Sequence, residues 1–121
     1  MATVGSDFAP YAGWMDRCGI DREHIRELHD SYTAQAYITT DQADNQITAF
    51  NPGAMSHATS FDVAAVPAEG GFAIVAPGNL DDMYRFAIAY GERGISCIFD
   101  PGQSIPGWPG ERLREAIEAA D

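Results

Sequence analysis

Three turns that combine glycine or proline with a polar side chain are the parts of this sequence best suited to bind a ligand. Each follows an apolar segment, and they are Gly5-Ser6-Asp7, Ala76-Pro77-Gly78-Asn79 and Asp100-Pro101-Gly102-Gln103. If those segments are parallel strands, the turns lie at their carboxyl ends, where α/β sheets bind ligands. Backbone N–H groups there could recognise a phosphate or a hydroxyl group. The same residues also form ordinary strand-to-helix turns, and none matches a dinucleotide or P-loop motif, so both interpretations stay open.

The other groups capable of chemistry do not form a recognisable site. The three histidines, His24, His29 and His57, do not have the spacing of zinc ligands. The polar residues 41–45 lack the central glycine and the following glutamate of a calcium loop, which favours a solvated hairpin tip. No serine lies in a G-x-S-x-G motif. From spacing alone we expect no catalytic residue and no metal site.

The net charge of the chain limits the classes of partner that it is expected to bind. The 121 residues include 18 Asp and Glu against 7 Lys and Arg, a formal net charge of −11. That field repels phosphate backbones and anionic lipids, which argues against nucleic-acid and membrane partners. All seven basic residues are arginines, so Schiff-base and Walker-lysine chemistry are excluded. No segment resembles a secretory leader or approaches the ~20 apolar residues of a membrane span, and a cytoplasmic location is expected. Cys18 and Cys97 are then expected to be free, buried thiols.

Alternating apolar segments and helical stripes predict an α/β fold in a single domain. In the first third, the pattern predicts a strand over residues 1–5 and a helix over 8–18, capped by Ser6 or Asp7 and ended by Gly19. Residues 20–31 are mixed and polar, which favours a short turn after Asp21. Only Ile25 and Leu28 are expected to be buried there.

The second half repeats the order strand, helix, strand, helix. A continuous apolar run predicts a strand over 72–76 covered on both faces, followed by a helix over 80–93. A second buried strand is expected over 95–99. A last helix over 111–120 would turn Leu113, Ala116, Ile117 and Ala120 inward. A short helix is also possible at about 54–58. Strands alternating with helices in this way form βαβ units with a parallel sheet.

An antiparallel β-hairpin interrupts that order. Two segments rich in β-forming residues, 33–40 and 46–50, flank the polar loop 41–45. Asn51-Pro52-Gly53 then ends the second segment. Alternation with period two places Ala36 and Ile38 on one face of the first strand, and Thr48 and Phe50 on one face of the second.

This hairpin and the residues that follow it resemble the lid of the ribokinase-like (PfkB) sugar and nucleoside kinases, most of all their bacterial adenosine-kinase-like branch. The similar segment runs T-A-Q-A-Y-I-T-T-D over 33–41, N-Q-I-T-A-F over 45–50 and P-G-A-M over 52–55. Flanking segments agree, among them M-A-T-V-G-x-D-F over 1–8 and I-F-D-P-G-Q over 98–103. The resemblance covers essentially the whole chain.

The resemblance implies a partial ribokinase-like open sheet of βαβ units with an inserted lid hairpin over 33–51. It also implies transfer of the ATP γ-phosphate, with Mg²⁺, to a hydroxyl of a sugar or nucleoside. The lid would lay Ala36, Ile38, Thr48 and Phe50 on the substrate, with its hinge at Asn51 and Gly53. Two such lids often form a dimer contact in this family, so a homo-oligomer through the hairpin or the sheet edges is expected.

Several family motifs do not occur in these 121 residues. The chain contains neither the G-G-x-x-x-N substrate motif nor the G-A-G-D motif that supplies the catalytic base and anion hole. We therefore expect the middle section of a truncated kinase, arising naturally, from a misassigned start or by deliberate shortening. Alone it should be inactive and should not bind ATP or Mg²⁺ tightly. The alternatives are a non-catalytic dimerisation or complementation module, and a ligand-binding α/β domain unrelated to kinases.

Overall fold

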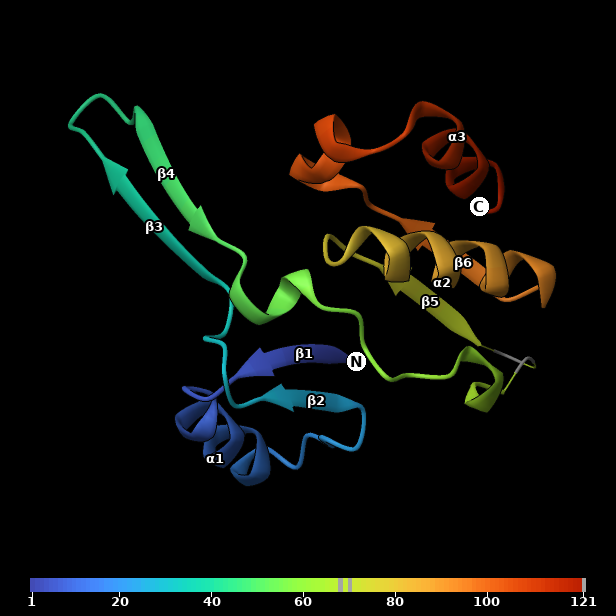
Figure 1. Cartoon of the computed structure of the whole chain (residues 1–121), viewed down its shortest axis with the longest axis horizontal. Coiled ribbons are helices and arrows are strands. Elements are labelled where there is room, and N and C mark those ends of the chain that lie inside the picture. The colour runs from blue at the N-terminus through green and yellow to red at the C-terminus, as the bar shows by residue number, and fades with distance from the viewer. Residues whose placement is uncertain (68, 70, 121) are drawn as a thin grey trace. The chain divides into compact units, whose positions relative to one another are not determined.

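The computed structural model describes residues 1–67, 69 and 71–120, and its chain divides into two compact units, 1–60 and 61–121. Each unit contains one βαβ motif with a two-stranded parallel sheet (Figure 1). Mixed α/β structure with parallel strand pairs and an antiparallel hairpin agrees with the predicted fold class. No helix in the described ranges is long and apolar enough to cross a membrane.

In the first unit, β1 (Ala2–Gly5) leads through α1 (Ala9–Arg17) to β2 (Ile25–Leu28). Strands β1 and β2 are parallel, with Ala2 opposite Ile25. The sequence did not predict β2, whose Ile25 and Leu28 are only half-buried and whose two central residues are charged and exposed. No residue of α1 is buried, although its apolar stripe follows helical spacing. Gly19 ends this segment with φ +67°, as expected.

The hairpin of the first unit consists of β3 (Gln35–Thr40) and β4 (Gln46–Asn51), and it confirms the predicted antiparallel pair. It projects from the rest of its unit as a two-stranded arm (Figure 1). At the tip, the Asp41 carboxylate accepts hydrogen bonds from the backbone N–H groups of Ala43 and Asn45. The tip is exposed, which confirms the solvated turn. A 3₁₀ helix, Gly53–Ser56, follows where a short helix was considered possible.

In the second unit, a 3₁₀ helix (Val63–Ala65) precedes β5 (Phe72–Val75), α2 (Leu80–Glu92) and β6 (Ser96–Phe99). A further 3₁₀ helix (Gly102–Gly107) and α3 (Gly110–Glu118) complete it. Strands β5 and β6 are parallel, with Ala73 opposite Cys97. Helix α2 packs on the face that carries Val75 and Cys97, and α3 packs against α2.

The core of the second unit lies between this sheet and its helices. Met83, Ala87 and Cys97 are almost completely buried there, and Ala116 of α3 is buried as well. Tyr84 connects the helices, because its hydroxyl donates to the Glu115 carboxylate at 2.7 Å. That hydrogen bond is the main reason that the pKa of Tyr84 is raised above its usual value.

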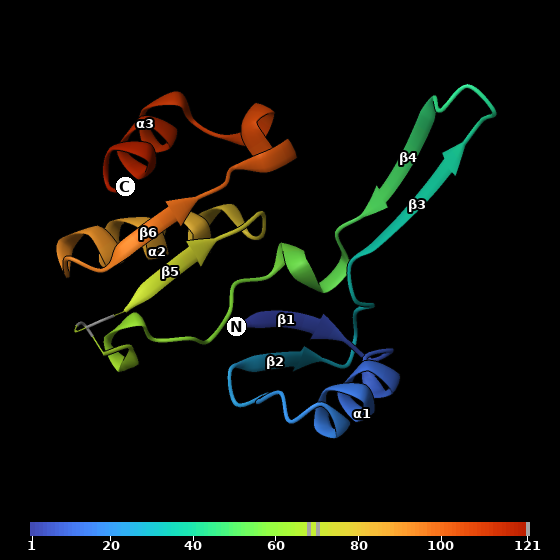
Figure 2. The same cartoon turned by 180° about the vertical axis from the view of Figure 1, so that it is seen from behind.

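Three expectations about burial are wrong. The strands of the second unit were expected to be covered on both faces, yet Phe72, Ile74 and Ile98 are 63%, 65% and 49% exposed. The reason is that α2 packs on the opposite face of β5 and β6 (Figure 2), and the described residues of the unit place nothing over this one. Ile117 is 54% exposed, because α3 turns Ala116 inward. Cys18 is an exposed thiol, whereas Cys97 is buried as expected.

Candidate functional site

The turn between β1 and α1 places Asp7 at the carboxyl end of a parallel strand. Asp7 does not cap α1: the N-cap is Phe8, and no side chain caps this helix. Pro10 lies in the first turn and has no N–H, which removes one of the donors that a capping carboxylate would use. The predicted cap by Ser6 or Asp7 is therefore wrong, and the Asp7 side chain turns toward the base of the hairpin.

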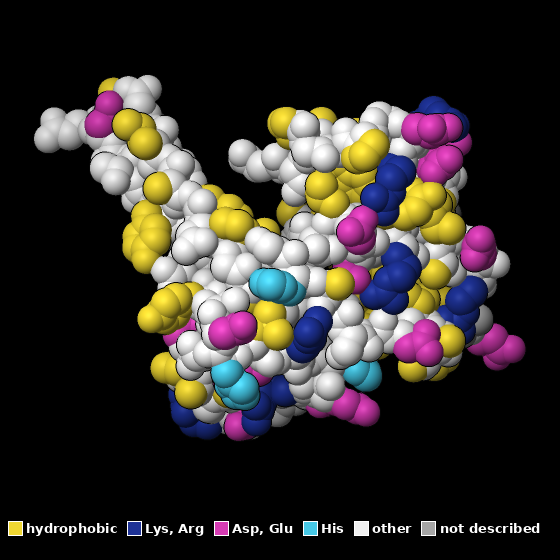
Figure 3. Space-filling model, in the orientation of Figure 1, with side chains coloured by type: hydrophobic (Ala, Val, Ile, Leu, Met, Phe, Trp, Pro, Cys, Tyr) yellow, Lys and Arg dark blue, Asp and Glu magenta, His cyan; other side chains and the backbone are white. Residues whose placement is uncertain are grey.

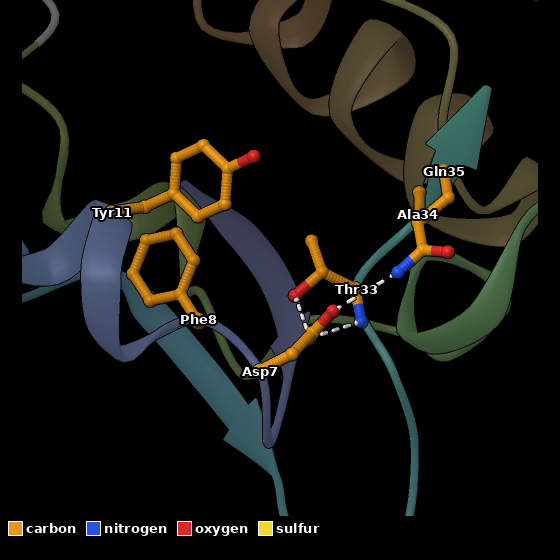
Figure 4. A pocket seen from close by; sticks show the side chains of 6 residues that line it. All are labelled: Asp7, Phe8, Tyr11, Thr33, Ala34 and Gln35. Atoms are coloured by element: carbon orange, nitrogen blue, oxygen red, sulfur yellow. Dashed lines mark hydrogen bonds between the residues drawn. The ribbon is translucent and has the colours of Figure 1, made fainter. Parts of the chain in front are cut away.

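At that base, Asp7 accepts three hydrogen bonds from two residues (Figure 4). Its Oδ1 accepts from the backbone N–H of Thr33 at 2.8 Å and from the Thr33 hydroxyl at 2.7 Å. Its Oδ2 accepts from Gln35 Nε2 at 3.1 Å. The Thr33 hydroxyl oxygen in turn accepts from the N–H of Gly5 at 3.0 Å, and Gln35 Oε1 accepts from the Tyr37 hydroxyl at 2.6 Å.

These hydrogen bonds also set the charge state of Asp7. The pKa of its carboxyl lies below the ordinary 3.8, first because of the Thr33 backbone N–H and then because of the Thr33 hydroxyl. Both donors favour the ionised form. Asp7 therefore carries a negative charge at neutral pH. It acts as a fixed acceptor, since three donors of the protein already point at its two oxygens.

Two glycines let the chain pass closely through this region. A Cβ on Gly5 would lie 2.2 Å from the carbonyl carbon of Tyr32 and 2.4 Å from the backbone nitrogen of Thr33. Gly53 has φ +46°, and a Cβ there would lie 2.2 Å from the Tyr32 carbonyl oxygen. The N–H of Ala54 donates to that same oxygen at 2.8 Å. Only glycine fits these two positions without a backbone shift.

A hollow of about 280 Å³ opens beside Asp7. Its walls include the rings of Phe8 and Tyr11, which stack with centroids 6.0 Å apart and planes 16° apart. Thr33, Ala34 and Gln35 complete the lining, with the polar groups directed at Asp7 (Figure 4). The polar groups of the lining already bond within the protein, so the two rings are the part of the hollow that is available to a ligand.

The hairpin brings together the four side chains predicted to face a substrate. Ala36 lies opposite Phe50 and Ile38 opposite Thr48, so all four share one face. Each is exposed, and hydrophobic side chains are visible along the arm in Figure 3. Tyr37 and Ile47 lie on the other face and are 65% and 78% exposed. Within this unit, the side chains on both faces of the hairpin are therefore accessible to a ligand or partner.

The predicted hinge residues lie where β4 ends. Asn51 is the last residue of β4, and its Oδ1 accepts from the N–H of Gly53 at 3.1 Å. Gly53 begins the 3₁₀ helix with its positive φ. Backbone geometry of this kind permits a change of chain direction here, and the hinge role itself stays a prediction.

The other two turns use their polar side chains locally. Asn79 Oδ1 accepts from the backbone N–H groups of Asp81 and Asp82, each at 3.1 Å, and so caps α2. Asp100 Oδ1 accepts from the N–H of Gly102 at 2.8 Å. These contacts favour ordinary turn chemistry over phosphate recognition at both turns. Among the described residues, no group of three His, Cys, Asp or Glu side chains could hold a metal ion.

The cluster at Asp7 was not predicted from the sequence. Its partners lie 26 and 28 residues away, and helix-capping rules assign Asp7 to α1 instead. The available signal was the position of Asp7 just beyond a strand, in one of the three turns singled out as ligand sites. The missing donor at Pro10 could have argued against the cap.

No protein-family model matches this chain. It is 31% identical to a nucleoside kinase of Methanocaldococcus jannaschii over 98% of the chain and 39% of that protein. Superposed on the solved structure of that nucleoside kinase, an archaeal member of the ribokinase family, it has a TM-score of 0.79 at 26% identity, covering 100% of this chain and 40% of the other.

A nucleoside kinase of Burkholderia thailandensis is more similar. Its structure in complex with inosine matches with a TM-score of 0.86 and 43% identity, over 99% of this chain and 40% of the other. Its structure in complex with ADP-inosine matches with a TM-score of 0.81 and 44% identity, over 99% and 38%. The chain thus spans about 40% of the length of the relatives that it matches.

Proposed function

Because this chain belongs to the ribokinase-like family, we propose that it is the lid-bearing section of a nucleoside or sugar kinase. The enzyme would transfer the γ-phosphate of ATP to a hydroxyl of the acceptor. The observation that carries this proposal is 43% identity over 99% of the chain to a nucleoside kinase solved with inosine. That relative favours a nucleoside of the adenosine or inosine type over a free sugar such as ribose.

In this proposal the hairpin is the lid. Its face with Ala36, Ile38, Thr48 and Phe50 is exposed and pre-aligned by the strand register, so it can close over a ligand without unfolding a core. Closure would exclude water, which would otherwise accept the γ-phosphoryl group and hydrolyse ATP. Phe50 is the natural platform for a base, because aromatic rings stack on nucleobases.

The implied reaction also uses ATP and Mg²⁺. The described residues include no group of three carboxylates, histidines or cysteines that could hold a metal ion, and the sequence contains no P-loop. We propose that the phosphates are held by polypeptide outside the matched 40% of the relatives, and that the 121 residues alone are inactive. The proposal includes a cytoplasmic location, where ATP is the common phosphoryl donor.

A chimera tests the proposal directly. The matched section of the B. thailandensis nucleoside kinase is replaced by this chain, and ATP-dependent nucleoside phosphorylation is followed by mass spectrometry. The chimera should be active, whereas the isolated chain should phosphorylate neither inosine, adenosine nor ribose. A folded but inactive chimera would contradict the family function, and turnover by the isolated chain would contradict its inactivity.

Within the chimera, two hairpin variants test the lid face. Phe50→Ala should raise the KM for the nucleoside roughly tenfold, since stacking of a base on an aromatic ring contributes ~1–3 kcal/mol. Ile47→Ala is the matched control, because Ile47 is 78% exposed on the opposite face of the same strand. It should leave KM within about twofold. Equal effects of the two variants would argue against the proposed face.

A second candidate function is a non-catalytic module that dimerises or complements another chain. It is favoured by the exposed apolar face of Phe72, Ile74 and Ile98, and by sheets that have only two strands each in the described chain. Unpaired strand edges and apolar faces of this kind usually acquire a partner. Light scattering at micromolar concentration should then show a dimer, and a monodisperse monomer would contradict it.

A further inference from the structure

The hairpin has almost no support of its own. Every position of β3 and β4 is exposed except Gln35, which is half-buried. An isolated two-stranded hairpin is at best marginally stable in water. Its order and its direction must therefore be determined at its base, where β3 leaves the rest of the first unit.

Asp7 is the centre of the contacts at that base. Its carboxylate binds Thr33, two residues before β3, through both the backbone N–H and the hydroxyl. It also binds Gln35, the first residue of β3, and Gln35 continues to Tyr37 on the same face of the strand. The hydrogen bonds therefore run from the turn after β1 to Tyr37, the third residue of β3.

Ionised acceptors make the stronger class of hydrogen bond, and these bonds are 2.7 to 3.1 Å long. The backbone adds two further restraints on the same segment. Ser6 N–H donates to the Ser31 carbonyl at 2.9 Å, and Tyr32 passes close to both Gly5 and Gly53. These backbone contacts restrain the segment 31–33, and the bonds of the Asp7 carboxylate restrain Thr33 and Gln35, the residues through which the chain passes into β3.

We propose that Asp7 is a positioning residue that fixes the direction of the hairpin relative to β1 and α1, acting through Thr33 and Gln35. It deepens the proposed function, because a lid must approach its ligand from a set direction. Asp7 would itself contact no reacting atom. Its carboxylate would restrict the arm to a narrow range of orientations, so that less conformational entropy is lost when the arm contacts its ligand.

A distance measurement within the first unit tests this without nucleoside or ATP. Spin labels are placed on Cys18, which is exposed at the end of α1, and on Thr48→Cys in β4. Cys97 is 1% exposed and should not react in the folded chain. The labelled chain is diluted with unlabelled chain, so that only distances within one molecule are recorded by pulsed electron paramagnetic resonance.

The chain should give one narrow distance distribution, and Asp7→Ala should at least double its width. Asp41→Ala is the matched control, because Asp41 also accepts three hydrogen bonds, at the tip instead of the base. It should leave the width unchanged. Equal widths for the chain and Asp7→Ala, or equal broadening by Asp41→Ala, would overturn the proposal.

A second pair of variants covers the case in which Asp7→Ala fails to fold. Thr33→Val removes the hydroxyl that donates to Asp7 and accepts from the Gly5 N–H, whereas Thr33→Ser keeps both hydrogen bonds. Valine should broaden the distribution and serine should restore it. A narrow distribution in folded Thr33→Val would overturn the proposal. In an active chimera, Thr33→Val should raise the KM for the nucleoside more than it lowers kcat. An inactive chimera would contradict only the proposed kinase function, because the distance measurement uses neither nucleoside nor ATP.

Discussion

Replacing Gly5 by alanine should destabilise the first unit strongly, although alanine is the smallest possible addition. The new Cβ would lie 2.2 Å from the Tyr32 carbonyl carbon and 2.4 Å from both the Ser31 oxygen and the Thr33 nitrogen. All three are backbone atoms, so no side chain can rotate away. Ordinary contact begins at 3.4 Å, and the segment 31–33 must therefore move by about 1.2 Å.

That movement has a calculable cost. It lengthens the hydrogen bond from Gly5 N–H to Thr33 Oγ1, now 3.0 Å, and that from Ser6 N–H to the Ser31 carbonyl, now 2.9 Å, beyond useful range. Each bond contributes about 1 kcal/mol. Overpacking adds about 1–3 kcal/mol. The free energy of unfolding should fall by roughly 3–5 kcal/mol.

Gly13→Ala is the matched control in the same unit. Gly13 lies inside α1, and a Cβ there meets only the flexible Arg17 guanidinium at 3.7 Å. The same substitution should therefore stabilise the helix by ~0.5–1 kcal/mol. Native-state amide exchange of Val4, whose N–H faces β2 in the parallel pair, reports the first unit alone. If Gly5→Ala changed its opening free energy by less than about 0.5 kcal/mol, the close approach of segment 31–33 would be refuted.

Three further outcomes follow from the contacts described above. The pKa of Asp7 is lowered, so the stabilisation of the hairpin base by Asp7 should be fully present above pH 3.8 and should be lost as the pH falls through the folded-state pKa. The protection of the Thr33 amide from exchange, measured as a function of pH, should show this loss. A loss that begins near pH 6 would contradict it. Met83 is 2% exposed, and Met83→Ala should lower the free energy of unfolding of the second unit by about 2–5 kcal/mol, measured by urea unfolding. Ile117 is exposed, and the control Ile117→Ala should lower it by less than about 0.5 kcal/mol. Glu115→Gln should return the raised pKa of Tyr84 toward its usual value, measured by NMR titration of the ring, and an unchanged pKa would show that burial is the main cause instead.

The parts of the fold that sequence alone predicted are those with local signals. The helix at Leu80–Glu92 has a helical apolar face, acidic residues in its first turn and Gly94 at φ +64° after its end. The hairpin has two β-rich segments around a polar loop, and period-two alternation correctly grouped Ala36, Ile38, Thr48 and Phe50. Each of these signals is contained within about 20 residues.

The features that sequence missed depend on distant partners. Strand β2 carries the charged Arg26 and Glu27 in its centre, and its partner β1 lies some 23 residues earlier in the chain. Asp7 follows the rules for a helix cap, yet Thr33 and Gln35 offer it better donors. The apolar pattern of β5 does not reveal how many faces are covered, which depends on where the helices of its unit pack.

The exposure of the hairpin has a consequence for how this sequence can change over time. A substitution in a packed core disturbs many neighbours, whereas eleven of the twelve positions of β3 and β4 contact solvent and only Gln35 is half-buried. Most replacements on the arm should therefore leave the rest of the unit folded. Substitutions should be tolerated mainly on the surface that is proposed to contact the acceptor. They should be tolerated least at Gly5 and Asp7, which hold that surface in place. Acceptor preference could then diversify by exchange of arm residues while the anchoring turn stays constant.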